Sequence, residues 1–326
     1  MSSPLHILRA MGRFAVFRLT GRRVPLALYW KVTRRCNLHC AYCGVSTRGG
    51  PELPTETLIT LLGEAAAAGA YRVTLSGGEP LVRSDIGALI RSLTSRGVSV
   101  GLDTNGILVP ERLDDLRSIT DATVSLDGDP EHHDALRGRG SHRAAVAGVE
   151  CLRRAGIPVT LAGVITSGSH GGIVGILDAA EALDARVLVQ PATPWLHDTT
   201  LPNPLVPDRA GILDAFARLL EHPASHRLAN TRAYLASFGD WPRMPRLPCP
   251  GGRIAAVVDP AGRVGSCDFG VPSDPWRDGV ELGFAGAFGA LPAPPDCVHC
   301  SCATTASVQR ALRLEPRAIL DLLRRT

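Results

Sequence analysis

Nine cysteines are the residues of this sequence whose type and spacing predict chemistry. Cys36, Cys40 and Cys43 form a first group, with three and then two residues between them. The others are spread along the chain at Cys151, Cys249, Cys267, Cys297, Cys300 and Cys302. In a reducing compartment, cysteine groups of this kind bind metal more often than they form disulfides.

The first group predicts an iron–sulfur cluster. Its spacing lets one loop wrap the edge of a cluster, and three thiolates are one ligand short for a four-iron cube. One iron would therefore stay open to an external ligand. A structural zinc loop is the alternative, because zinc takes four protein ligands and His39 is a candidate for the fourth.

The elements that must position these thiols follow from the pattern over residues 26–191, where β-branched runs alternate with helical periodicity. We expect strands over 26–32, 72–76, 98–104, 122–127, 159–165 and 186–190, and helices over 55–68, 85–96, 111–118, 142–155 and 171–183. Six such units predict an α/β fold, a partial (βα)6 barrel with a parallel sheet. Chemistry is expected in the loops after the carboxyl ends of the strands.

The chain divides into four expected segments. Residues 1–25 form a basic arm or helix, 26–191 the barrel, and 192–246 a linker with a helix over 209–221. Residues 247–326 are rich in Pro, Gly and Cys, with a strand returning at Val264 and a last helix over 316–325. Because such a segment builds little core, we expect it to depend on a bound cluster for stability.

Composition limits the class of protein. At 45% hydrophobic and 20% charged residues the 326-residue chain is typical of a soluble globular protein, and neither a membrane span nor a signal peptide is evident, which predicts the cytoplasm. Residues 1–51 contain nine Lys or Arg and no Asp or Glu. A helix docked on its own domain is the favoured interpretation, with an anionic substrate or an acidic membrane surface as the alternative partner. Nucleic acid is not expected.

Four motifs in order resemble one family. The CxxxCxxC run with Tyr42 before its last cysteine, at the end of the first strand, resembles the signature of the radical S-adenosylmethionine (SAM) superfamily. The runs 76–80 (SGGEP), 103–106 (DTNG) and 125–128 (SLDG) follow the next three strands, where that family places its SAM contacts. The resemblance covers roughly residues 26–191.

The resemblance implies roles for individual residues. Cys36, Cys40 and Cys43 would hold a [4Fe–4S] cluster whose open iron SAM chelates, while Gly77, Gly78 and Glu79 would contact the methionine moiety. The other implied cofactor-binding residues are Tyr42, Asn105, Ser125, Asp127, Arg137 and Gln190. A turn cap remains the alternative for Asp127, and a solvent-exposed place on a short helix for Arg137. His132 and His133 are expected on a loop at the surface or near the substrate.

The later cysteines resemble the auxiliary-cluster module of the Twitch and SPASM subgroups. This implies a second [4Fe–4S] cluster held by Cys249, Cys267, Cys297 and Cys300, with a four-cysteine zinc site as the alternative. Cys302 is a candidate catalytic thiol that donates a hydrogen atom to substrate, a replacement ligand or a passive residue. Cys151 is expected to pack on the apolar face of its helix.

The resemblance also implies a reaction. The Twitch spacing is similar to that of sugar-modifying enzymes such as the aminocyclitol dehydrogenase of butirosin biosynthesis. A 5′-deoxyadenosyl radical would then remove hydrogen from a carbinol carbon of a small carbohydrate, and the auxiliary cluster would accept an electron. A flavodoxin or ferredoxin would reduce the first cluster. The arginine-rich composition, with Lys31 as the single lysine, loosely fits specialised metabolism such as antibiotic biosynthesis.

A lipid substrate stays open, because the basic, partly amphipathic first 23 residues could rest on a membrane surface. Three further alternatives stay open at this point. Epimerisation of a sugar carbon would use Cys302 to return hydrogen to the opposite face. Maturation of a ribosomal peptide is the second, although only some 25 residues precede the first strand, too few for an N-terminal peptide-recognition domain. A non-catalytic iron–sulfur or zinc protein is the third, and it would leave the SGGEP run without a purpose.

Overall fold

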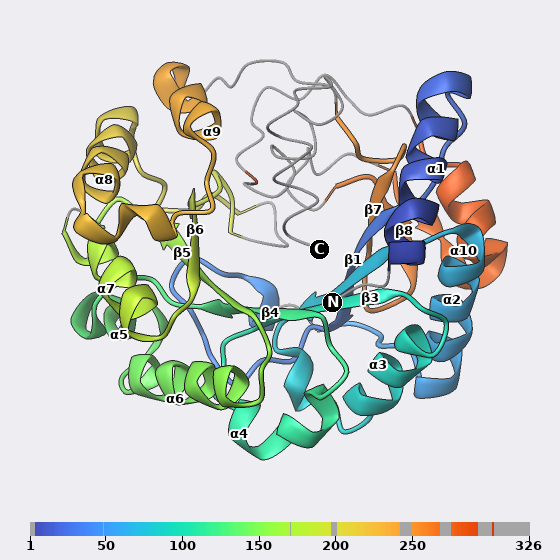
Figure 1. Cartoon of the computed structure of the whole chain (residues 1–326), viewed down its shortest axis with the longest axis horizontal. Coiled ribbons are helices and arrows are strands. Elements are labelled where there is room, and N and C mark those ends of the chain that lie inside the picture. Colours follow the sequence, from blue (N-terminus) through green and yellow to red (C-terminus); the bar gives the residue numbers. More distant parts are fainter. Residues whose placement is uncertain are drawn as a thin grey trace.

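The structure is a computed structural model that describes residues 4–47, 49–169, 171–196, 201–241, 249–267 and 275–292, together with Cys302. These residues form one curved sheet with helices along its outer side (Figure 1). The strands are β1 (Ala27–Thr33), β2 (Arg72–Gly77), β3 (Ser99–Thr104), β4 (Asp121–Ser125), β5 (Val159–Ile165), β6 (Arg186–Pro191), β7 (Ala255–Val258), β8 (Arg263–Gly265) and β9 (Arg277–Asp278).

The strand order is β6-β5-β4-β3-β2-β1-β7-β8-β9. Strands β1 to β6 pair in parallel with their neighbours in the chain, which puts all their carboxyl ends on one edge. Strand β7 adds to β1 in parallel, and β8 and β9 follow antiparallel. The expected partial (βα)6 barrel is confirmed, and β8 is the strand expected at Val264.

The α-helices of the described residues are α1 (Pro4–Thr20), α2 (Thr55–Ala68), α3 (Ile86–Thr94), α4 (Val109–Arg112), α5 (Pro130–Arg137), α6 (Ser141–Arg154), α7 (Gly175–Ala182), α8 (Arg209–Glu221), α9 (Arg232–Ala236) and α10 (Gly279–Gly289). Helices α2 and α8 have the expected bounds. The single helix expected over 111–118 is wrong, because α4 stops at Arg112 and a 3-10 turn, Leu113–Leu116, continues the chain.

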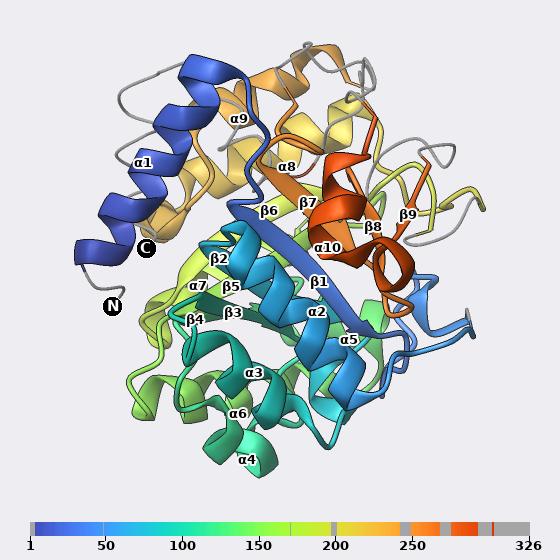
Figure 2. The same ribbon diagram turned by 90° about the vertical axis from the view of Figure 1, so that its right-hand side faces the viewer.

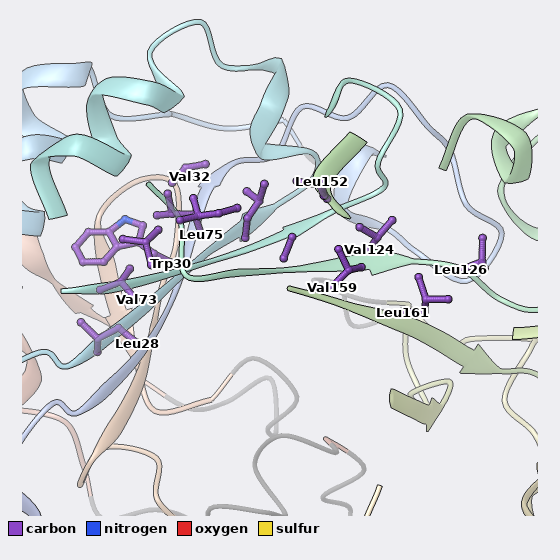
Figure 3. Packing of buried hydrophobic residues seen from close by; sticks show 14 of the residues in the cluster. Leu28, Trp30, Val32, Val73, Leu75, Val124, Leu126, Leu152, Val159 and Leu161 are labelled. Atoms are coloured by element: carbon purple, nitrogen blue, oxygen red, sulfur yellow. The ribbon is translucent and has the colours of Figure 1, made fainter. Parts of the chain in front are cut away.

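The core lies between the sheet and the outer helices. Alternate side chains of each strand point toward those helices, as Leu28, Trp30 and Val32 of β1 do beside Val73 and Leu75 of β2 (Figure 3). All five are buried, and burying each such side chain contributes about 1.5 to 3 kcal/mol. The intervening residues of each strand therefore face the inner, concave side of the sheet.

The carboxyl-terminal part of the described chain joins this core. Trp30 of β1 stacks on Phe284 of α10 with ring centroids 6.0 Å apart, and α10 lies beside α2 (Figure 2). Residues 255–258, which the sequence places in the Cys-rich segment, thus extend the same sheet through β7. The helix expected over 316–325 lies outside the described residues.

Helix α1 docks on the barrel by one face. Phe14 and Phe17 pack against Val24, Leu26 and Ile254, which confirms the docked-helix interpretation for that face. Among the described helices, none is long and apolar enough to cross a membrane.

Candidate functional site

The loop after β1 carries the first cysteine group. Cys36, Cys40 and Cys43 are each partly buried, and the seven described cysteines form no disulfide. Burial raises the pKa of the Cys36 and Cys40 thiols, that of Cys40 to about 11, and the neighbouring thiols raise them further. The three thiols are therefore close enough to influence one another. In the cluster-free protein Cys36 and Cys40 hold protons that a metal must displace.

These side chains do not converge on one ion. Within the described ranges, no three His, Cys, Asp or Glu side chains meet at a position for a single metal ion. His39, the candidate fourth zinc ligand, has its Nδ1 3.1 Å from Ser46 Oγ. A four-iron cluster that leaves one iron open needs one thiolate at each of its other three irons. Three thiols on one loop are compatible with that requirement.

The turn after β2 is fitted to this loop. The Gly78 amide donates to Thr33 O at 2.9 Å, and the Glu79 amide donates to Arg35 O at 2.9 Å. A Cβ added at Gly77 would lie 2.3 Å from Thr33 O, and one added at Gly78 would lie 2.3 Å from Arg35 O. Both glycines are thus required by close backbone packing. Their predicted contact with SAM remains a prediction.

The Glu79 side chain links the turns that follow β2 and β3. Its Oε1 accepts hydrogen bonds from Thr104 Oγ1 at 2.9 Å and from the Leu81 amide at 3.0 Å, and its Oε2 accepts from the Asn105 amide at 2.7 Å. Burial raises the pKa of Glu79 to about 7, because it outweighs these hydrogen bonds, which lower the pKa. Asn105 Nδ2 in turn donates to Asn37 Oδ1 of the cysteine loop at 2.7 Å. The turns after β2 and β3 therefore hold the loop after β1.

A buried ion pair supports the other side of the loop. Asp127 is fully buried and accepts from Arg137 Nε at 2.5 Å and from the Tyr42 hydroxyl at 2.8 Å. Burial alone raises the pKa of Asp127, but the Arg137 guanidinium outweighs it and holds the pKa below the ordinary value. Arg137 also lies over the Tyr42 ring and has Nη1 3.9 Å from Cys40 Sγ. The pair therefore brings positive charge to a cluster thiol.

Helix α5 corrects two of our expectations. His132 and His133 lie on this helix and not on a loop, and His133 is buried with its Nδ1 accepting from the Asp127 amide at 3.1 Å. Arg137, at the end of α5, is only 9% exposed, so the solvent-exposed alternative is wrong. The sequence signal was present, because the Asp129 side chain accepts from the His132 amide as an N-cap and Pro130 begins the helix.

Ser125 and Gln190 lie at the same edge of the sheet. Ser125 of β4 pairs with Ala162 of β5, and Gln190 of β6 pairs with Val164. Both alternate with buried residues that face the helices, so their positions belong to the inner face. The edge carries both positions, as expected. Their contact with SAM remains a prediction.

The segments that carry Cys249 and Cys267, two of the four expected auxiliary ligands, pack against each other. The Gly251 amide lies 3.4 Å from Cys249 Sγ, and a Cβ added at Gly251 would lie 2.5 Å from Ser266 O. The turn that carries Cys249 therefore packs on the residue before Cys267. Cys297 and Cys300 lie outside the described residues, and Cys302 is partly exposed. Cys151 packs at the edge of the core, as expected.

Two polar residues of β1 that our sequence analysis missed, Tyr29 and Lys31, lie on the inner face. The Tyr29 hydroxyl donates to Asp103 Oδ2 and lies 3.0 Å from Ser76 Oγ, and Lys31, 2% exposed, pairs in register with Ser76. Burial raises the pKa of Asp103 to about 6, although its hydrogen bond from Tyr29 lowers it. Tyr29 and Lys31 alternate with three apolar residues of β1, a pattern that marks them as inner-face positions.

A second set of missed residues holds the start of the cysteine loop. Glu52 Oε1 accepts from Thr33 Oγ1 at 2.6 Å and from the Arg34 amide at 2.9 Å. Arg34 Nη2 donates to Asp259 Oδ2, at the end of β7, at 3.2 Å. Asp259 is buried, so the carboxyl-terminal part of the chain contacts the loop directly. No motif pointed to either acid, because both contacts join distant parts of the sequence.

Comparison with known proteins decides the family. The family model for the radical SAM superfamily matches residues 30–177. A PqqA peptide cyclase from Streptomyces rochei is 30% identical over 74% of this chain and 69% of its own length. The chain belongs to the radical SAM superfamily. An AdoMet-dependent heme synthase from Methanosarcina barkeri is 36% identical over 49% of this chain and 48% of its own length. The chain thus spans about half to seven tenths of these relatives.

A solved structure shares the fold. SuiB from Streptococcus suis, in a structure bound to S-adenosylmethionine, superposes with a TM-score of 0.68 at 17% identity over 84% of this chain and 68% of SuiB. This structure supports the α/β fold of the chain with its partial barrel. The finer resemblance to sugar-modifying enzymes gains no support from the peptide cyclase, the heme synthase or SuiB, and it remains a prediction.

Radical SAM membership implies SAM and one [4Fe–4S] cluster, and the site fits both. Three thiols stand on one loop, a buried arginine faces one of them, and glycines bring the β2 turn against the loop. Carboxylate, hydroxyl and amide groups gather at the same edge of the sheet. Cys36, Cys40 and Cys43 are therefore the residues that would hold the cluster.

Proposed function

We propose that this radical SAM enzyme acts on a peptide. The observation that carries the proposal is the match to a PqqA peptide cyclase, which extends over 74% of the chain and so beyond the cysteine loop. The shared fold with SuiB, which has also been solved bound to its precursor peptide SuiA, is compatible with it. The peptide alternative of the sequence analysis thus takes the place of the carbohydrate as the leading candidate.

The protein's own residues provide the setting for radical chemistry. When SAM and the cluster are bound, reductive cleavage of SAM supplies a 5′-deoxyadenosyl radical that abstracts hydrogen from a C–H bond. Cys36, Cys40 and Cys43 would hold the cluster at the carboxyl edge of the sheet. Arg137 places a positive charge beside Cys40, which favours its thiolate. The inner-face residues below this edge are the candidates for substrate contact.

An auxiliary [4Fe–4S] cluster is part of the proposal. Its support is the packing of the Cys249 turn on Ser266, next to Cys267. With Cys297 and Cys300 as the other ligands, all four positions would be filled by protein, so the cluster would transfer electrons without binding substrate. A flavodoxin or ferredoxin would reduce the first cluster. Cys302 remains a candidate hydrogen donor.

The test uses the anaerobically reconstituted full chain and a variant with Cys36→Ala, Cys40→Ala and Cys43→Ala. Synthetic peptides translated from short reading frames beside the gene are compared with aminocyclitols and monosaccharides. We expect reductant-dependent 5′-deoxyadenosine and a peptide mass change with the unmodified chain only. A carbohydrate that stimulates 5′-deoxyadenosine formation and is itself turned over, while no peptide does either, would refute the peptide substrate. That result would restore the dehydrogenase or epimerase candidate.

The same samples report on the auxiliary cluster. Two four-iron clusters require about eight irons per chain, and the triple variant should keep about four. About four irons in the unmodified chain and none in the triple variant would remove the auxiliary cluster from the proposal.

A further inference from the structure

Helix α1 leaves one long apolar face uncovered. Its exposed large apolar side chains are Leu8 (65%), Met11 (52%), Val16 (43%) and Leu19 (86%). Ala15 is also exposed. At about 100° per residue, Leu8, Met11, Ala15 and Leu19 fall on one side of the helix. We call these residues and Val16 the α1 stripe.

The opposite face of α1 is already used for docking. Phe14 and Phe17 pack against Val24 and Ile254, and Arg13 Nη1 donates to Gly69 O, just before β2, at 2.6 Å. Arg23 donates to Leu291 O after α10. The helix is therefore fixed to the barrel, and the α1 stripe is not the face that holds it there.

The charge around the stripe has one sign. Residues 1–23 contain five arginines and no Asp or Glu. Arg18 and Arg22 are exposed, and by helical periodicity position 18 borders the stripe. An apolar strip beside exposed arginines matches the boundary of an anionic bilayer, where apolar side chains enter the acyl region and cations meet the headgroups.

The dimensions fit a helix that lies on a surface. At 17 residues α1 is about 26 Å long, shorter than the roughly 30 Å hydrocarbon core, so it would lie along the interface. It is attached at the end of the sheet where the strands begin, as its contact with Gly69 shows, while the cysteine loop lies at the other end of β1 (Figure 2). Membrane contact would therefore leave the site accessible.

A second copy of the chain fits the stripe less well. Packing α1 against α1 would bring the flanking arginines of both copies together without an acidic partner in residues 1–23. We propose that α1 is an interfacial helix that binds the protein to an anionic lipid surface. This inference does not depend on the substrate proposed above.

The test is cosedimentation of the full chain with vesicles of phosphatidylcholine containing phosphatidylglycerol, and with phosphatidylcholine alone. We expect binding to the anionic vesicles only. The triple variant Leu8→Gln, Met11→Gln, Leu19→Gln should bind at least about tenfold more weakly than the unmodified chain, because its apolar contact with the bilayer is lost. The double variant Arg18→Gln, Arg22→Gln should bind more weakly at low salt and lose most of its salt dependence.

A control variant changes three exposed leucines elsewhere in the chain. Leu201→Gln, Leu220→Gln and Leu282→Gln alter side chains 59%, 45% and 48% exposed and should bind anionic vesicles like the unmodified chain. Iron content and far-ultraviolet circular dichroism check folding in every variant. The inference is overturned if the unmodified chain stays in the supernatant or binds both vesicle types equally. It is also overturned if the triple variant still binds anionic vesicles like the unmodified chain and loses only self-association or the binding of an acidic peptide.

Discussion

Arg137 is the residue on which the buried part of the site depends. It donates to both carboxylate oxygens of Asp127 and approaches Cys40 Sγ. Changing Arg137→Gln would leave Asp127 buried and charged without its partner, which costs roughly 3 to 5 kcal/mol. We expect a loss of this size in the free energy of unfolding of the cluster-free protein, measured by urea denaturation. Reconstituted iron should also fall, because the pKa of Cys40 rises further without the guanidinium.

Two control variants separate this effect from the mere loss of an arginine. Arg117 forms an ion pair with Asp114, but its side chain is 69% exposed, so Arg117→Gln should change the unfolding free energy by about 0.5 kcal/mol or less. Arg137→Lys keeps the charge and loses the two-point contact, so an intermediate loss is expected. An equal free energy of unfolding for Arg137→Gln and the unmodified chain would show that the Asp127–Arg137 ion pair does not stabilise the fold.

Asp103 should give the protein a pH dependence of defined sign. Its pKa is raised to about 6, mainly by burial, so the folded state favours the protonated acid. The stability from this group is complete below about pH 4 and is lost as the pH rises through 6. We expect Asp103→Asn to become more stable relative to the unmodified chain between pH 4 and 7. Chemical denaturation at each pH measures the difference, and a constant difference would contradict the assignment.

The close fit of the β2 turn to the cysteine loop belongs to the scale of elements. A Cβ at Gly78 would meet Arg35 O at 2.3 Å and Arg34 O at 2.7 Å. Gly78→Ala must therefore push the turn and the loop apart, and we expect a loss of about 1 to 3 kcal/mol in the unfolding free energy, with reduced iron retention. Gly168→Ala is the control, because nothing lies within 4 Å of its added Cβ. Equal iron content and stability of the two variants would show that the fit is loose.

The elements also show how far the sequence alone reaches. Periodicity predicted every strand from β1 to β6 and the place of the cysteine loop, because alternating burial and the motifs at strand ends are local signals. It missed α5, whose Asp129 cap and Pro130 start were taken for a loop. It could not find Glu52, Asp259 or the Tyr29–Asp103 contact, because each depends on strand register or on residues far apart in the chain.

At the scale of the whole molecule, β7 and α10 connect the carboxyl-terminal region to the barrel. Phe284 is fully buried, stacks on Trp30 of β1 and lies 6.1 Å from Phe288, centroid to centroid. Because β7 also pairs with β1 along four residues, we expect the two regions to unfold together. The cysteine motifs predicted residues 247–326 as a separate segment, since they contain no information on which strand of the barrel this segment pairs with.

This coupling predicts the behaviour of two variants of one helix. Phe284→Ala leaves a cavity against β1 and should cost roughly 3 to 5 kcal/mol, whereas Leu282→Ala, at a side chain 48% exposed, should change the unfolding free energy by about 0.5 kcal/mol or less. We expect Phe284→Ala to shift one shared transition, seen alike by circular dichroism and tryptophan fluorescence. Two separate unfolding transitions, with the barrel's transition at the same denaturant concentration as in the unmodified chain, would mean that the carboxyl-terminal region folds independently. The contact of that region with the cysteine loop through Asp259 would then be dispensable for the stability of the barrel.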